Sequence, residues 1–187
     1  MRLENVTRIF VVILFLISPI ENDNYIIVKY KNETTYDAGK FKNSFRNDVH
    51  HIIYEGKEVD LTKQFIIAAN GIIEIHFNKS ISSLEGFFGT QMDSNAKKYN
   101  FNRFSYFDSS SVENVQDLFY QCSLLEEINF NNFNTSKVTN MMALFYQCKK
   151  LKSLDLSNFV TSLVESMENM FYQCTSLEYL DISNFNT

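Results

Sequence analysis

The C-terminal part of this 187-residue chain repeats one unit three times at a constant step. The three cysteines, Cys122, Cys148 and Cys174, are 26 residues apart. The same step relates two sets of phenylalanines and one set of threonines: Phe119, Phe145, Phe171; Phe133, Phe159, Phe185; Thr135, Thr161, Thr187. A fixed period of this length is typical of stacked supersecondary units rather than of a closed globule.

Each unit contains two hydrophobic periods. The apolar residues of the first half recur at helical spacing: Val138, Met141, Leu144, Phe145 and Cys148 in the middle copy. This pattern predicts a short helix with one buried stripe. Leu151, Leu154 and Leu156 then follow Leu-x-x-Leu-x-Leu, which predicts a strand. The predicted fold class is therefore α/β, a leucine-rich-repeat-like solenoid whose units must stack to bury their apolar faces.

The sequence resembles the BspA-like leucine-rich-repeat surface proteins, which include a repeat domain of unknown function on mycoplasma-type lipoproteins. The resemblance rests on Ser-Lys-Val-Thr-Asn-Met (136–141), Leu-Phe-Tyr-Gln-Cys (144–148) and Leu-Lys-Ser-Leu-Asp-Leu-Ser-Asn-Phe (151–159), with echoes in the neighbouring copies. It covers roughly the C-terminal half of the chain and implies adhesion or host contact. Phe159 departs from the general pattern, which has Asn or Cys there. A column of polar side chains beneath the turn, if present, is then expected at Asn132, Asn158 and Asn184. The alternative is that the Phe column takes its place.

Residues 21–80 predict a small β-rich N-terminal cap. Residues 25–30 are β-branched and aromatic, and residues 52–54 lead through Glu55-Gly56 into a tight turn. Residues 65–68 and 72–77 flank Asn70-Gly71, which predicts a type I′ hairpin. Such a cap shields the apolar end of a solenoid.

Residues 81–111 predict a degenerate first repeat, with an insertion placed in the polar stretch 92–98, and residues 112–187 hold the three clear repeats. No polar closing element follows the third repeat. Because solenoids normally end in a capping repeat, the array is interpreted as truncated. The alternative is a short protein whose last coil packs against a partner.

Residues 1–20 predict a targeting signal. Arg2 and Arg8 precede an apolar run from Ile9 to Ile20 that is too short for a membrane span of ~20 residues. A cleaved signal peptide is the favoured interpretation, and an uncleaved signal anchor is the alternative, because small residues are scarce near a cleavage site. Secretion or display on the cell surface follows from either, with no other membrane span.

The composition argues against two classes of binding partner. The net charge is −5 and the sequence carries no long basic run, so neither nucleic acid nor anionic lipid is a predicted partner. An odd number of cysteines in one column predicts buried thiols rather than disulfides or a metal site. His50, His51 and His76 lack the partners of a catalytic or metal site. No enzyme activity, metal or cofactor is predicted.

Two sets of side-chain columns remain as candidate binding surfaces. The outward positions of the predicted strands form the first: Glu127, Ser153, Tyr179; Asn129, Asp155, Asp181; Asn131, Ser157, Ser183. In leucine-rich solenoids this face binds ligands, although an exposed strand face is polar in any case. Stacked aromatic and amide side chains form the alternative: Tyr120, Tyr146, Tyr172 with Gln121, Gln147, Gln173. Sequons at Asn32, Asn78 and Asn134 permit glycosylation.

Taken together, the sequence predicts a secreted or surface-displayed, non-catalytic protein that binds a protein or glycan on another surface. Two other hypotheses stay open. One is a passive structural array without a specific ligand, and the other is the ectodomain of a larger receptor or enzyme.

Overall fold

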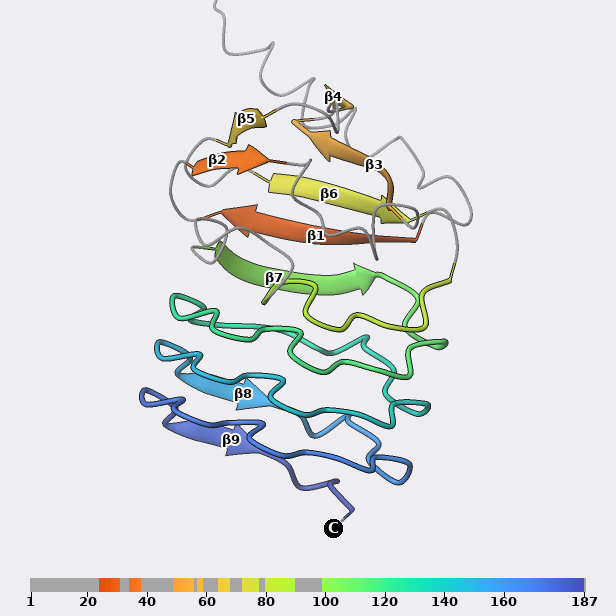
Figure 1. Ribbon diagram of the computed structural model, residues 1–187, viewed down its shortest axis with the longest axis vertical. Coiled ribbons are helices and arrows are strands. Elements are labelled where there is room, and N and C mark those ends of the chain that lie inside the picture. Colours follow the sequence, from red (N-terminus) through yellow and green to blue (C-terminus); the bar gives the residue numbers. More distant parts are fainter. Residues whose placement is uncertain are drawn as a thin grey trace, which may run out of the picture.

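The computed structural model describes residues 24–30, 34–37, 49–55, 57–58, 64–67, 72–77, 80–89 and 99–186. Their elements form an N-terminal group of strands followed by a stack of coils (Figure 1). One hydrophobic core runs through both parts, from Ile26 in the first strand to Met170 in the last coil. The signal predicted for residues 1–20 lies outside the described residues.

The N-terminal strands form two sheets. The larger contains five strands in the order β4-β3-β6-β1-β7. Its strands are β1 (Asn24–Tyr30), β3 (Val49–Tyr54), β4 (Lys57–Glu58), β6 (Ile72–Phe77) and β7 (Tyr99–Tyr106). The smaller sheet pairs β2 (Thr34–Asp37) with β5 (Gln64–Ile67).

One predicted hairpin is confirmed and another is wrong. β3 and β4 pair in antiparallel register across the turn at Glu55, which has a φ of 50°. β5 and β6, by contrast, lie in different sheets, because β6 is a central strand with β1 and β3 on its two edges. In that arrangement Ile75 lies between Ile26 and Ile52, and all three are fully buried. Burial of these side chains outweighs the local turn signal of 70–71, two residues that are not described.

The boundary predicted after residue 80 is also displaced. β7 belongs by sequence to the degenerate repeat, yet it pairs with β1 and forms the edge of the five-stranded sheet. Phe77 of β6 contacts Phe87, which precedes β7 in the sequence, with ring centroids 5.9 Å apart. It also contacts Phe107, which follows β7, with ring centroids 5.5 Å apart. Residues 81–111 therefore join the sheet to the coils. The insertion predicted within 92–98 lies outside the described residues.

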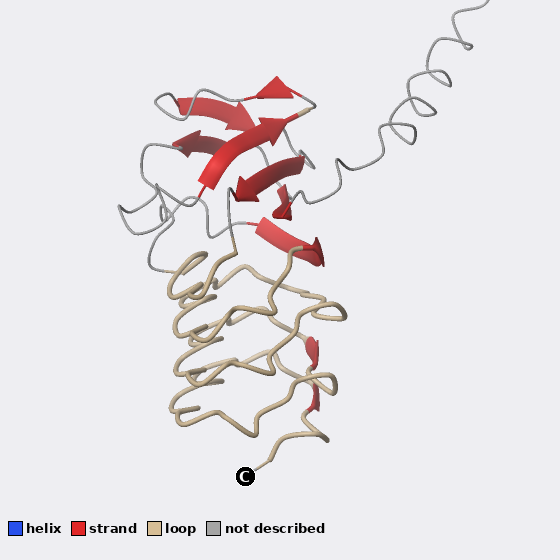
Figure 2. Ribbon diagram, turned by 90° about the vertical axis from the view of Figure 1, so that its right-hand side faces the viewer, coloured by secondary structure: helices blue, strands red, loops and turns tan. Residues whose placement is uncertain are grey.

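The repeats form successive coils that lie parallel to one another (Figure 2). We call residues 112–137 the first coil, 138–163 the second and 164–186 the third; residues 81–89 belong to an opening coil. Parallel bridges join Ser83, Asn114, Asn140 and Ser166 along one side of the stack. On another side β8 (Ser153–Asp155) and β9 (Tyr179–Asp181) pair in parallel. The repeat period in the sequence is therefore the length of one coil.

The short helix predicted in each unit is replaced by consecutive turns. The described residues contain no helix, and so none that could cross a membrane. In the first coil Asp117 and Gln121 have φ values of 56° and 59°, and the corresponding residues of the next two coils are also positive. These left-handed residues interrupt a helix. The physical reason is spacing: hydrogen-bonded coils lie about 4.8 Å apart, whereas a helix with its side chains is about 10 Å wide.

Burial of the predicted apolar stripe is nevertheless confirmed. Val138, Met141, Leu144, Phe145 and Cys148 are each at most 1% exposed. Phenylalanines stack in register along the coil axis, with centroids 5.3 to 5.9 Å apart, in the column Phe88, Phe119, Phe145, Phe171. Ring stacking stabilises the interior in addition to the burial of apolar surface area.

Candidate functional site

The outward side chains of β8 and β9 form one continuous surface of the repeats. The pairing aligns Ser153 with Tyr179 and Asp155 with Asp181, while Leu154 between them is 1% exposed. The first coil continues these columns without an assigned strand. We call the outward set the strand-side surface: Glu127, Asn129, Asn131, Ser153, Asp155, Ser157, Tyr179, Asp181, Ser183. The predicted columns of the second and third coils are therefore brought together as expected.

The middle column of this surface also serves the fold. The Oδ1 atoms of Asn129, Asp155 and Asp181 each accept a hydrogen bond from the backbone N–H two residues later, at 2.8 to 2.9 Å. This is the Asx turn that Asn and Asp form in turns. The Ser157 hydroxyl adds a second hydrogen bond to Asp155 Oδ1 at 2.6 Å. The repeated Asx-x-Ser/Asn spacing in the sequence signals these turns, a role that the sequence analysis missed.

Hydrogen bonding and neighbouring charge shift two pKa values on this surface. Hydrogen bonds from the Ser183 N–H and hydroxyl lower the pKa of Asp181. The charge of Asp181 in turn raises the pKa of Tyr179, whose hydroxyl lies 3.4 Å from Asp181 Oδ2. At neutral pH this corner therefore presents a carboxylate beside a neutral phenol, a combination that accepts and donates hydrogen bonds.

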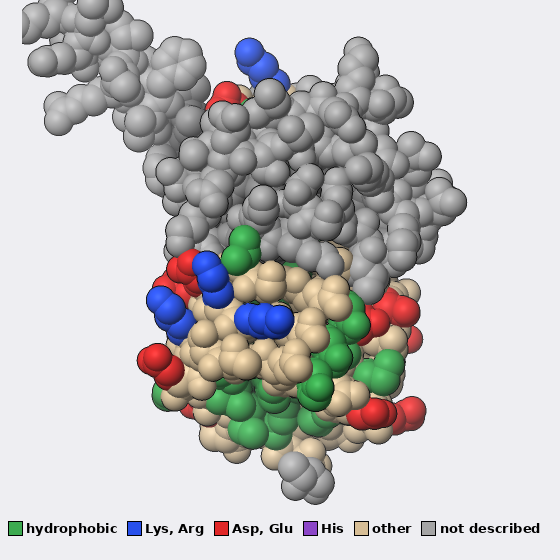
Figure 3. All heavy atoms as spheres, turned by 60° about the vertical axis from the view of Figure 1, so that its left-hand side comes forward, with side chains coloured by type: hydrophobic (Ala, Val, Ile, Leu, Met, Phe, Trp, Pro, Cys, Tyr) green, Lys and Arg blue, Asp and Glu red, His purple; other side chains and the backbone are tan. Residues whose placement is uncertain are grey.

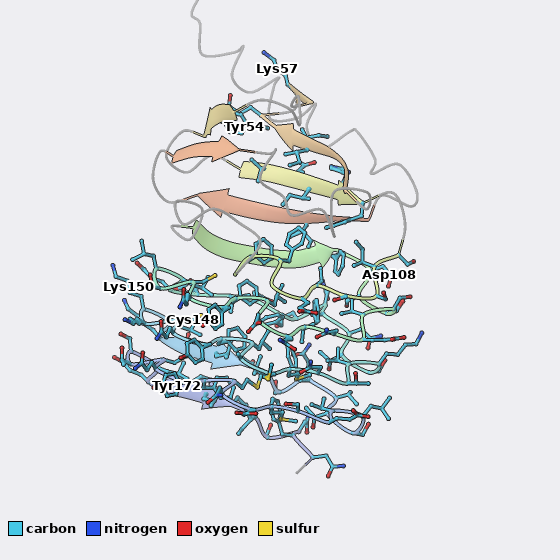
Figure 4. The ribbon with its side chains drawn as sticks, in the orientation of Figure 1. Tyr54, Lys57, Asp108, Cys148, Lys150 and Tyr172 are labelled. Atoms are coloured by element: carbon cyan, nitrogen blue, oxygen red, sulfur yellow. The ribbon has the colours of Figure 1, made fainter. Side chains whose placement is uncertain are left out.

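A short basic segment lies beside the strand-side surface. Lys149, Lys150 and Lys152 are exposed at the turn that leads into β8, and Figure 4 shows Lys150 at the edge of the stack. Lys and Arg side chains gather on this flank in Figure 3. At the position of Lys152 the adjacent coils carry Glu126 and Glu178, joined to it by backbone hydrogen bonds. The second coil is thus basic between two acidic neighbours.

The alternative face is a continuous stack of tyrosines. Adjacent rings of Tyr120, Tyr146 and Tyr172 lie 4.8 Å apart, with interplanar angles of 10° and 19°. Desolvation and the two neighbouring phenols raise the pKa of Tyr146. Beside them the Gln147 amide donates to Gln173 Oε1 at 2.8 Å. Because the ring faces pack against each other, this column presents ring edges and hydroxyls.

The cysteines lie inside the coils as free thiols. Cys122 and Cys148 are fully buried, and Cys174 of the last coil is half-buried. Each Sγ donates to a carbonyl of the preceding coil, at 3.1 to 3.6 Å: those of Phe88, Phe119 and Phe145. Burial, with a smaller effect of the neighbouring thiols, raises the pKa of Cys148 well above its ordinary value. The hydrogen bonds from these thiols to backbone carbonyls therefore link adjacent coils.

Two columns of polar side chains form hydrogen bonds between adjacent coils. Asn158 Nδ2 donates to the carbonyls of Phe130 and Phe133 in the first coil, and Asn184 donates in the same way to Ser157. This places the Asn ladder at two of its three predicted positions. A second ladder, which the sequence analysis did not assign, consists of the buried hydroxyls of Ser109, Thr135 and Thr161. The constant step between the threonines is the signal that could have found it.

The remaining candidates lie apart from these surfaces. His50 and His51 are in β3, and the buried His76 of β6 lies 3.1 Å from a carboxylate oxygen of Glu74. In the part of the chain that the structure describes, no cluster of three His, Cys, Asp or Glu side chains is arranged to hold a metal ion. Asn134 is exposed and its Oδ1 accepts the N–H of Ser136 at 2.9 Å, whereas the sequons at Asn32 and Asn78 are not described.

Comparison with known proteins identifies a family for the repeats. A family model described as "Mycoplasma protein of unknown function, DUF285" matches residues 84–187. Comparisons with curated proteins and with solved structures returned no match. The match begins at Leu84 in the opening coil and includes all three repeats, more than half of the chain. The chain therefore belongs to the DUF285 family of mycoplasma-type proteins of unknown function.

Proposed function

We propose that this protein is a secreted or cell-surface protein that binds another macromolecule through its strand-side surface and catalyses no reaction. In this proposal the stacked coils are a variant of the leucine-rich solenoid of BspA-like surface proteins, with turns in place of the helix. The partner is a protein or glycan on another surface. Membership of a mycoplasma-type family and the exposed, ordered columns of side chains support it.

One observation carries the proposal. The parallel pairing of β8 with β9 places Asp155 and Asp181 in adjacent rungs, which are about 4.8 Å apart. Carboxylates directly opposite each other repel, and a cationic or hydrogen-bond-donating ligand relieves that repulsion. The Tyr179 hydroxyl donates to Asp181 Oδ2 at 3.4 Å, and its oxygen adds an acceptor beside the carboxylates. The surface therefore favours a basic peptide segment or a polyhydroxylated glycan.

The chemistry of these residues suits binding rather than catalysis. The strand-side surface contains no histidine or cysteine, and the Ser157 hydroxyl donates to Asp155 Oδ1 at 2.6 Å within an Asx turn. Its carboxylates already accept backbone hydrogen bonds in Asx turns, which hold them in fixed positions. Fixed polar groups lower the entropic cost of binding.

The test is a double substitution on each face. Asp155→Asn with Asp181→Asn removes both charges, while the turns persist because Asn129 makes the same turn natively. Tyr146→Ser with Tyr172→Ser is the matched variant of the other face. Labelled wild-type and variant proteins are compared for attachment to surfaces coated with lysine-rich peptides and to a glycan array. We expect the Asp pair to weaken attachment at least tenfold and the Tyr pair to leave it unchanged.

Two other results would redirect the proposal. Loss of attachment in the Tyr pair alone, with both variants folded, would move the binding site to the tyrosine column. Insensitivity to both pairs would favour the passive structural array, in which the Asx turns are the whole role of the middle column.

A further inference from the structure

The tyrosine column brings phenols of adjacent coils into contact. Tyr120 of the first coil and Tyr146 of the second have ring centroids 4.8 Å apart and an interplanar angle of 10°. Tyr146 lies equally close to Tyr172 of the third coil, at 4.8 Å and 19°. The first and second coils each have another coil on both sides, so the contact between Tyr120 and Tyr146 belongs to the interior of the stack.

The backbone fixes the register of these rings. The Gln121 N–H donates to the Tyr146 carbonyl at 2.7 Å, and the Gln147 N–H donates to the Tyr172 carbonyl at the same distance. Gln121 and Gln147 have φ values of 59° and 57°, so the chain turns in the same way after each tyrosine. The folded chain therefore holds the phenols face to face, and they need no diffusional encounter to meet.

The tyrosines are also accessible, unlike the phenylalanine column that precedes them by one residue. Phe119 and Phe145 are fully buried, whereas Tyr120 and Tyr146 are only half-buried. Desolvation and the two neighbouring phenols raise the pKa of Tyr146, so its hydroxyl keeps its proton at neutral pH. An oxidant in solution therefore reaches protonated phenols that already contact other phenols.

We infer that the tyrosine column is a site of oxidative cross-linking, where a one-electron oxidant joins adjacent coils through a dityrosine bond. The oxidant is a peroxidase that uses hydrogen peroxide. The principal bond joins Tyr120 to Tyr146, and a second joins Tyr146 to Tyr172 in other molecules. This inference does not depend on the proposed binding role of the strand-side surface.

The reaction balances between the two phenols and the peroxide. Each phenol gives one electron to the peroxidase and one proton to water, which leaves two phenoxyl radicals. A carbon–carbon bond forms between ring carbons ortho to the two oxygens, and each of these carbons then loses a proton while each oxygen regains one. The two electrons and two protons released in total reduce one hydrogen peroxide to two waters. Because the rings are already in contact, the coupling step is unimolecular.

Tyr179 provides a control within the same chain. It is 55% exposed, and the residue beside it in the adjacent coil is Ser153, which has no aromatic ring. The oxidant reaches Tyr179 at least as readily as Tyr146, but a Tyr179 radical meets no phenol in the adjacent coil. Links from Tyr179 therefore require encounters between molecules and depend on protein concentration.

The experiment treats the full chain with peroxidase and hydrogen peroxide at several protein concentrations and identifies linked tryptic peptides by mass spectrometry. Tyr146 is the only tyrosine of the tryptic peptide 138–149, so a link to this peptide is a link to Tyr146. Its link to Tyr120, with the loss of two hydrogen atoms, should be roughly tenfold more abundant than any link to Tyr179. Its yield should not change with protein concentration. Links mainly through Tyr179, or a Tyr120–Tyr146 yield that falls in proportion to dilution, would overturn the inference.

Three variants test the contact itself. Tyr146→Phe keeps a ring in the stack but removes the middle phenol, so it should abolish links within the column, including any between Tyr120 and Tyr172. Tyr179→Phe should leave the Tyr120–Tyr146 link unchanged. Hydrogen-exchange protection of the Gln121 N–H, which donates to the carbonyl of residue 146, shows that Tyr146→Phe still folds.

Tyr120→Phe gives an independent result if Tyr146→Phe does not fold. It should remove the link between Tyr120 and Tyr146 but keep the link between Tyr146 and Tyr172. A Tyr120–Tyr172 link of wild-type abundance in folded Tyr146→Phe would show that ring contact does not select the pair, and would contradict the inference. Loss of every link to peptide 138–149 in Tyr120→Phe would contradict it as well.

Discussion

The hydroxyl of Thr135 holds the backbone of Val160 in the next coil by two hydrogen bonds. Thr135 Oγ1 accepts the Val160 N–H at 2.8 Å and donates to the Val160 carbonyl at 3.1 Å. Thr161 makes the same pair of contacts to Asn186, at 2.7 and 3.4 Å. Thr135 is 1% exposed, so water does not replace these bonds. This column is therefore a structural element of the stack.

Thr135→Val should destabilise the protein although it preserves the volume of the side chain. The substitution removes both hydrogen bonds to the Val160 backbone, each of which contributes about 0.5–1.5 kcal/mol to the free energy of unfolding. Urea unfolding monitored by circular dichroism measures the change. Thr135→Ser is the control, because Ser109 already occupies this column and its Oγ accepts the Asn134 N–H at 2.6 Å. A Val variant as stable as wild type, or a Ser variant that loses more stability than the Val variant, would contradict the role of the hydroxyl.

Gly89→Ala should loosen the junction between the opening coil and the first coil. A Cβ at Gly89 would lie 2.4 Å from the Asp117 carbonyl oxygen and 2.6 Å from the Tyr120 nitrogen, both backbone atoms that cannot rotate away. Overpacking of this kind costs about 1–3 kcal/mol. The change in the melting temperature measures it, with Ser82→Ala at an exposed position of the same coil as the control. A Gly89→Ala protein as stable as wild type would show that the two coils separate easily.

The thiol column should make stability fall at alkaline pH. Folding raises the pKa values of Cys148 and Cys174 mainly through burial, so their protonated forms stabilise the fold fully below the unfolded value of about 8.5. The unfolded chain loses these protons first as the pH rises, and the free energy of unfolding decreases above about pH 8.5. Urea unfolding between pH 7 and 9.5 measures the slope. Cys148→Ala should be less stable at pH 7 but lose less stability over this range.

Maleimide labelling should distinguish the same cysteines. In native protein Cys174, which is half-buried, should react first, while Cys122 and Cys148 should react only after denaturation. The reaction requires the thiolate, so a raised pKa slows it at a given pH. Mass spectrometry of tryptic peptides identifies the labelled residue. Rapid native labelling of Cys148 would contradict its burial in the stack.

Lys152→Glu should destabilise the stack more than Lys150→Glu, although both change the net charge equally. Glu126 and Glu178 occupy the position of Lys152 in the adjacent coils, so the first substitution places three carboxylates in one column. Like charges in opposite positions destabilise a sheet by roughly 0.2–1 kcal/mol per pair. The neighbours of Lys150 are Leu124 and Ser176, which carry no charge. Denaturation at low and high salt measures the difference, which should shrink at high salt.

Several features of the fold follow from local patterns. The 26-residue step specifies the length of a coil, and the Leu154 and Leu156 alternation correctly separates the buried side of β8 from the exposed side. The residues around Glu55 correctly predict the β3–β4 hairpin, because its strands are adjacent in the sequence. Burial of the Phe and Cys columns also follows from periodicity. In each case the information lies within one unit or one turn.

Other features depended on contacts between distant segments. A spacing of three and four residues between apolar positions fits both a helix and a series of turns with left-handed residues. The tertiary structure decides between them, since the N–H groups of Val115 and Asp117 donate to the next coil instead of closing a helix. Similarly, β6 pairs with β1 and β3 because that arrangement buries Ile75 between Ile26 and Ile52. The sequence by itself determined which side chains are buried, whereas pairing between distant segments determined where each backbone hydrogen bond is made.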